Sequence, residues 1–204
     1  MTMHARTLPL NLAPWAEVVP NMPPMSMDEF LAYVDDDGYR YELVEGTLVR
    51  MVGTRPRAAR IARRLYRALD AFVQTQDLGT VTQPDEVYDF EGSGQKDTGL
   101  LPDIGFYNAA REPLVDPDKP YPFAPDLVVE IASPQQYRPG MATKARRYLA
   151  GGTALVWIVW PTRRQVDVWR AGDTQPSATL RAGDALDGAY VVPGFAFAVA
   201  DLFA

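Results

Sequence analysis

The sequence predicts one α/β (α+β) domain, a mixed β-sheet flanked by helices, with an N-terminal hairpin and an extended arm in front of it. Its 204 residues exceed the roughly 150 of an average domain only modestly. With 47% hydrophobic and 23% charged residues, the composition is that of a globular protein. The periodic segments follow the order hairpin, helix, three strands, helix, strands, which is typical of a sheet covered by helices. We expect an arm over residues 1–24 and a single domain over residues 25–204.

The arm contains five prolines among apolar side chains, so we expect it to lie extended across its own domain or across a partner's. The partner that this arm suggests is a second copy of the chain, in a homodimer. Ser26 and Glu29 have the spacing of a capping box and predict the start of a short helix. Two extended runs, 39–44 and 47–52, are separated by Glu45-Gly46 and predict a hairpin.

A long amphipathic helix is predicted over residues 57–76, where apolar side chains recur at helical spacing. Between positions 50 and 67 the chain has seven arginines and no acid. This run predicts either a solvated helix face or a ridge that contacts the phosphates of nucleic acid. The candidate nucleic-acid contacts are Arg55, Arg57, Arg60, Arg64 and Arg67.

The rest of the chain alternates strands with one more helix. Extended segments are predicted at 80–90, 100–107 and 126–132, followed by a helix over 141–150 that Gly151-Gly152 ends. The nearly all-apolar run 155–159 predicts a central strand buried on both faces, and 165–169 predicts the strand beside it. Short strands are expected over 185–203.

Composition limits the chemistry that this domain can perform. Without cysteine there are no disulfides, thiolate metal sites or cysteine nucleophiles, and the single His4 lies in a terminal tail. We find neither a secretory signal nor an apolar run near the roughly 18 residues of a membrane span, so we expect a cytoplasmic protein without membrane contact. The net charge of −6 argues, taken as a whole, against nucleic acid as a partner, although the arginine run argues for it.

Three acids, Glu42, Asp103 and Glu130, each lie in an otherwise apolar extended segment. An ionised carboxylate there is costly unless it is paired or bound to metal. If Asp103 lies on the strand next to Glu130, the two meet within a few ångströms, because alternate side chains share a face. Such an oxygen-only site suits Mg²⁺ or Mn²⁺. The alternative is that these acids form buried salt bridges with arginines.

Five elements in order resemble the bacterial Uma-type "putative restriction endonuclease" family, a divergent branch of the PD-(D/E)XK nuclease superfamily. They are residues 41–46 (YELVEG), 102–104 (PDI), 125–134 (PDLVVEIASP), Lys144 with Tyr148, and 152–159, which ends in Trp157-Ile158-Val159. The resemblance spans roughly residues 25–203 and implies a restriction-endonuclease-like core that acts on DNA with Mg²⁺ or Mn²⁺.

Carried over by residue, the resemblance makes Asp103 and Glu130 the metal-binding acids, with the backbone carbonyl of Ile131 as a further ligand. It makes Glu42 a third member of the acidic cluster. Lys144 would orient the attacking water and stabilise charge that develops on the phosphate. The catalytic set that it implies is therefore Asp103, Glu130, Lys144 and Glu42.

Four positions depart from the family's pattern. The superfamily's usual lysine position holds Ala132, a frequent histidine is replaced by Ala58, and a frequent aspartate is replaced by Gly140. The Asp-Pro that follows the Trp strand in the family is replaced by Trp160-Pro161. Two functions stay open: a Mg²⁺-dependent endonuclease that hydrolyses DNA, or a catalytically inactive nuclease fold that serves as a nucleic-acid-binding or oligomerisation module.

Overall fold

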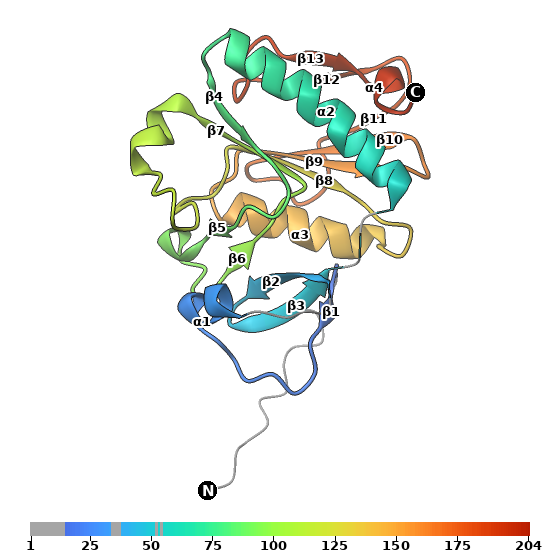
Figure 1. Ribbon diagram of the computed structural model, residues 1–204. Coiled ribbons are helices and arrows are strands. Elements are labelled where there is room, and N and C mark those ends of the chain that lie inside the picture. The colour runs from blue at the N-terminus through green and yellow to red at the C-terminus, as the bar shows by residue number, and fades with distance from the viewer. Residues whose placement is uncertain (1–14, 34–37, 52, 54) are drawn as a thin grey trace, which may run out of the picture.

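The computed structural model describes residues 15–33, 38–51, 53 and 55–204 (Figure 1). His4 and most of the expected arm lie outside these residues. The elements are β1 (Glu17–Val18), α1 (Met27–Ala32), β2 (Arg40–Val44), β3 (Thr47–Met51), α2 (Pro56–Thr75), β4 (Gly79–Thr82), β5 (Tyr88–Asp89), η1 (Glu91–Ser93), β6 (Gly99–Leu100), β7 (Ile104–Asn108), η2 (Ala109–Leu114), β8 (Leu127–Ile131), α3 (Arg138–Ala150), β9 (Leu155–Trp160), β10 (Gln165–Arg170), β11 (Ala178–Leu180), β12 (Ala185–Asp187), β13 (Ala196–Ala198) and α4 (Val199–Leu202).

The main sheet has six strands in the order β11-β10-β9-β8-β7-β4. Strands β8 and β9 run parallel, and the other neighbouring strands are antiparallel. Every residue of β8 and β9 is buried, as the apolar runs in the sequence predicted. The expected mixed sheet is therefore confirmed.

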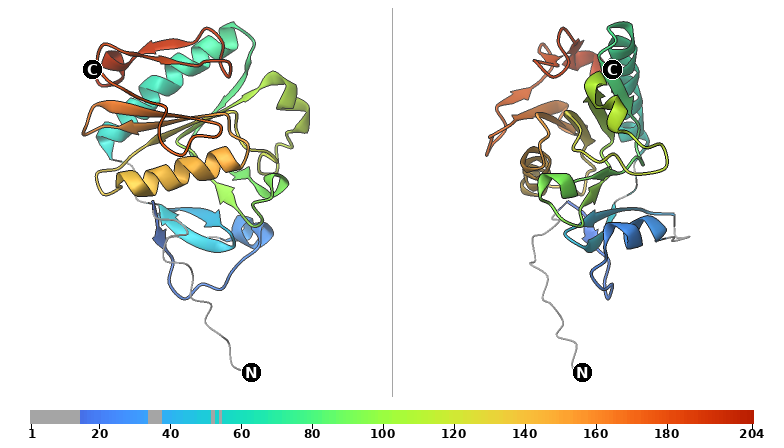
Figure 2. Two further views of the ribbon diagram at one scale, coloured as in Figure 1. Left: turned by 180° about the vertical axis from the view of Figure 1, so that it is seen from behind. Right: turned by 90° about the vertical axis from the view of Figure 1, so that its left-hand side faces the viewer.

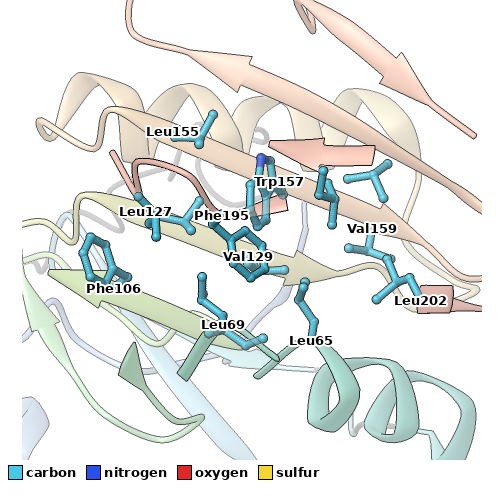
Figure 3. Close-up of a cluster of buried hydrophobic side chains, with 14 of the residues drawn as sticks. Leu65, Leu69, Phe106, Leu127, Val129, Leu155, Trp157, Val159, Phe195 and Leu202 are labelled. Atoms are coloured by element: carbon cyan, nitrogen blue, oxygen red, sulfur yellow. The ribbon is translucent and has the colours of Figure 1, made fainter. Parts of the chain in front are cut away.

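Helices α2 and α3 cover opposite faces of this sheet (Figure 2). On one face, Leu65 and Leu69 of α2 pack with Val129 of β8, in the cluster shown in Figure 3. On the other face, Val128 packs with Tyr148 of α3. Side chains of β8 alternate between the two clusters, so the side chain of Glu130 lies on the α3 face.

A second sheet, in the order β1-β3-β2-β6-β5, lies beside α3 (Figure 1). The expected hairpin is present as β2 and β3, with Val44 paired to Thr47. Its turn residues, Glu45 and Gly46, both have positive φ, 49° and 76°, as the tight hairpin turn that matches strand twist requires. From the arm, β1 pairs with β3, and Trp15 is buried. The described part of the arm thus packs on its own domain.

Two expected strands are each broken into two. The segment 80–90 forms β4 and β5, which belong to different sheets, because the chain turns at Pro84-Asp85, where Asp85 has φ 78°. The segment 100–107 forms β6 and β7, interrupted at Pro102, which has no amide to donate. Helix α3 begins at Arg138, earlier than predicted, because Pro139 suits a first helical turn.

The capping box at Ser26 and Glu29 is confirmed in both directions. No helix in the described part of the chain is long and apolar enough to cross a bilayer.

Candidate active site

Strands β7 and β8 bring Asp103 and Glu130 together. Ile104 pairs with Val129 in an antiparallel register, so one step outward places Asp103 opposite Glu130. Oδ2 of Asp103 accepts a hydrogen bond from the amide of Ile131 at 2.7 Å, which holds the carboxylate against β8. The meeting of these acids, predicted from strand alternation, is observed.

Both acids line a small cavity of about 40 Å³, together with Arg40, Arg55 and Ile131 among others. This volume accommodates a few water-sized groups. Oε2 of Glu130 accepts no hydrogen bond from the described residues. Oδ1 of Asp103 has only the guanidinium of Arg40, 3.8 Å away, and Arg40 also pairs with Asp85. Each acid therefore keeps one oxygen available to a ligand in the cavity.

Lys144 lies behind Glu130 and is completely buried. Its Nζ is 2.8 Å from Oε1 of Glu130 and 3.0 Å from Oε1 of Glu42. On α3 it belongs to the buried set Met141, Lys144, Ala145 and Tyr148, the i, i+3, i+4, i+7 pattern of a helix face turned to the core. Lys144 thus lies in the interior, and neither it nor Glu42 lines the cavity.

Glu42 is fully buried, with both oxygens engaged. The indole N–H of Trp15 donates to Oε2 at 3.0 Å, and the amide of Leu101 donates to Oε1 at 3.1 Å. Glu42 joins the acidic cluster through Lys144, which stands between Glu42 and Glu130, and its catalytic role stays a prediction.

Two contributors were not predicted, Trp15 and Tyr148. The hydroxyl of Tyr148 donates to Oε1 of Glu130 at 2.7 Å. Its signal in the sequence was its position four residues after Lys144, on the same helix face. Trp15 comes from the arm, and its carbonyl accepts from Nε2 of Gln136 at 2.9 Å. No sequence pattern linked Trp15 to Glu42, 27 residues away.

Burial dominates the electrostatics of the cluster. It raises the pKa of Glu130 to about 7, with Asp103 and Glu42 adding to the rise and Lys144 opposing it. Burial also raises the pKa of Asp103, although the hydrogen bond from the amide of Ile131 acts to lower it. For Lys144, burial acts to lower the pKa, but the two glutamates more than offset it and the pKa is raised. The cluster has three carboxyl groups and one ammonium, so it has fewer positive than negative groups.

The donor set fits a small divalent cation. Mg²⁺ is typically bound by one or two carboxylates and retains several waters, which two acids on one cavity allow. Within the described ranges there is no group of three or more His, Cys, Asp or Glu side chains able to hold a metal. Asp103 and Glu130 are therefore the side chains that would hold it, and the carbonyl of Ile131 stays a predicted third ligand.

Three of the positions that depart from the family's pattern are buried. Ala58 lines the cavity, so a longer side chain there would reach it. Ala132 is buried in the cluster beneath α3, on the side from which Lys144 approaches. Gly140 is buried within α3.

The predicted arginine stripe runs along α2. Arg55, Arg57, Arg60 and Arg67 are exposed, and their side chains form no ion pair or hydrogen bond with other described residues. Arg64 is half-buried and donates to backbone carbonyls of α4. Arg55, which precedes α2, lines the cavity of the two acids, so the stripe begins at the candidate site.

The architecture is that of a nuclease fold. It is similar to a crystal structure described as a putative nuclease belonging to DUF820 from Anabaena variabilis ATCC 29413, with a TM-score of 0.73 and 22% identity over 88% of this chain and 98% of that one. A likeness at this identity concerns the fold. No curated protein matches the chain.

The Uma2 family model, described as "Putative restriction endonuclease", matches residues 27–200. The chain belongs to this family, as the sequence resemblance predicted.

Proposed function

We propose that the protein is a Mg²⁺- or Mn²⁺-dependent endonuclease that hydrolyses phosphodiester bonds of DNA. The observation that carries this proposal is the pair Asp103 and Glu130 on one cavity, each with an oxygen free of hydrogen bonds, backed by the buried Lys144. Membership of a family described as restriction endonucleases supports the reaction class.

The chain's own residues have separable roles in this proposal. Asp103 and Glu130 hold the cation, which when bound polarises a phosphate oxygen and makes water a stronger nucleophile. Lys144, fixed by Glu42, keeps a positive charge behind Glu130 and limits the repulsion between the carboxylates. The candidate arginines supply contacts to the phosphate backbone: Arg55, Arg57, Arg60, Arg64 and Arg67.

The test is a nicking assay on supercoiled plasmid with Mg²⁺ or Mn²⁺. We expect the wild type to cut, and the Asp103→Asn protein to lose the activity, because a neutral amide is a poor ligand for a hard cation. Asp28→Asn is the matched control, since Asp28 is exposed on α1 and should leave cutting unchanged. Cutting that survives Asp103→Asn would refute this site.

A second, non-catalytic function is favoured by the position of Lys144, which forms ion pairs with two glutamates and does not line the cavity. Under it, the domain binds nucleic acid or oligomerises without catalysis. Calorimetric titration with Mn²⁺ separates the two functions. The endonuclease should give a heat of binding that Asp103→Asn removes, whereas the inactive domain should bind DNA in a salt-sensitive way and give no such heat.

A further inference from the structure

A second pocket, of about 320 Å³, lies next to the candidate site. It is bounded by the first half of α2, the turn between β9 and β10, and the end of α4 with the two residues after it. Four arginines line it, and no Asp or Glu side chain does: Arg57, Arg60, Arg64 and Arg164.

Two of these arginines are fixed by backbone carbonyls. Nη1 of Arg64 donates to the carbonyls of Asp201 and Leu202 at 2.9 and 3.1 Å. Nη1 of Arg164 donates to the carbonyl of Phe203 at 2.9 Å, and its guanidinium lies 5.5 Å from the centre of that ring. Because a guanidinium has five N–H donors, each keeps donors for a ligand. These two side chains are held in place before any ligand arrives.

The other two, Arg57 and Arg60, have no acidic partner. Both are exposed, and neither guanidinium forms an ion pair or hydrogen bond with the rest of the described chain. Four like charges around one pocket repel one another, so an anion that enters lowers this repulsion. The planar guanidinium matches the oxygens of a phosphate group in a two-bond geometry. The chemistry of the pocket therefore suits a phosphate.

We infer that this arginine pocket binds a backbone phosphate of the nucleic acid and anchors the strand beside the candidate active site. The inference rests on the proposed function, because it concerns the same substrate. Arg55, immediately before α2, lines the cavity of the two acids, and Arg60 and Arg64 follow it within α2. At a rise of about 1.5 Å per residue, Arg60 and Arg64 lie about 8 and 14 Å along the helix from Arg55. Successive phosphates of one strand are about 3.4 Å apart along the duplex axis, so these distances span roughly two to four phosphates.

The pocket shows which arginines of the predicted run lie together and adds one from outside the run. Arg164 joins it from the turn after β9, 100 positions after Arg64, whereas Arg67 lies outside the pocket. Sequence spacing showed which arginines share a helix face, but it could not show that Arg164 faces them.

The test measures binding of a labelled DNA duplex without metal, in EDTA, over a range of salt. The double variant Arg57→Gln/Arg60→Gln removes two pocket cations while keeping helix propensity. We expect weaker binding and a salt slope reduced by about 1.8, the release expected from two phosphate contacts. The control, Arg63→Gln/Arg181→Gln, removes two exposed arginines outside the pocket and should leave the slope near that of the wild type. Equal losses in both variants would overturn the inference.

A second arm titrates pyrophosphate into the same proteins by calorimetry. Pyrophosphate binding that the pocket substitution removes, with duplex binding unchanged, would assign the pocket to a small phosphate-bearing ligand and overturn its assignment to nucleic acid. Because these assays contain no metal and follow no cleavage, failure of the anchor is distinguishable from failure of the endonuclease, which the Asp103→Asn nicking assay decides.

Discussion

The ammonium of Lys144 lies 2.8 Å from the carboxylate of Glu130, and both side chains are buried. Glu42 lies on the other side of the lysine, so one buried ammonium balances two buried carboxylates. A buried ion pair adds little to stability in itself, but removal of one partner leaves an uncompensated charge. The first prediction follows from this asymmetry.

Lys144→Met should lower the free energy of unfolding by about 3–5 kcal/mol, since two buried glutamates lose their shared counter-charge. Urea unfolding measures the effect. Arg146→Met, on the exposed side of the same helix, should cost less than about 1 kcal/mol. Similar costs for the two substitutions would show that Lys144 does not carry the charge balance.

Trp15→Phe removes the indole donor to Oε2 of Glu42 and keeps an aromatic ring. A buried carboxylate oxygen without its donor costs about 1–3 kcal/mol, and the freed Glu42 should hold Lys144 less firmly. We therefore expect Trp15→Phe to weaken Mn²⁺ binding, measured by calorimetry. Trp157→Phe is the control, because the buried indole N–H of Trp157 has no partner among the described residues. Equal changes in Mn²⁺ affinity would argue against a role for Trp15 in the site.

The raised pKa of Glu130 predicts a pH dependence of both stability and metal binding. Because folding favours its protonated form, its contribution to metal-free stability is complete below its ordinary pKa of 4.5 and is lost as the pH rises through about 7. Mn²⁺ requires the ionised form, so the affinity should rise with pH and level off above about 7. Affinity that is constant between pH 5 and pH 8 would contradict this. In the metal-free protein, Glu130→Gln should reduce the pH dependence of stability.

Dimerisation stays a prediction of the apolar arm. The described part of the arm, with Trp15, contacts its own domain, so a deletion that tests it should end before Trp15. Removal of residues 1–14 should halve the mass measured by light scattering if these residues join two subunits, and an unchanged mass would refute the prediction.

The sequence predicted the fold class and the meeting of the two acids because both depend on local periodicity. Alternation in β8 put Glu130 and Val128 on one face, and the apolar run of β9 marked the centre of the sheet. The strand breaks at Pro84 and Pro102 were missed, although Pro84 lies in the polar run 83–86 and Pro102 has no amide to donate. Turn geometry decides which strands belong to which sheet.

The placement of Lys144 and Glu42 needed the structure. A lysine next to two arginines on a helix reads as a solvated face, and only the packing of α3 against β8 turns it inward. Trp15 and Arg164 were beyond sequence reasoning for the same reason, since their partners are brought close by tertiary contacts between distant segments.

The central claim is that Asp103 and Glu130 together bind a divalent cation. A crystal soaked in Mn²⁺ and measured at a wavelength with anomalous signal tests it most directly. We predict one anomalous peak in the cavity, at about 2.0–2.3 Å from an oxygen of each acid, as expected for a hard cation. An empty cavity between Asp103 and Glu130 in a crystal that holds Mn²⁺ elsewhere would contradict the account.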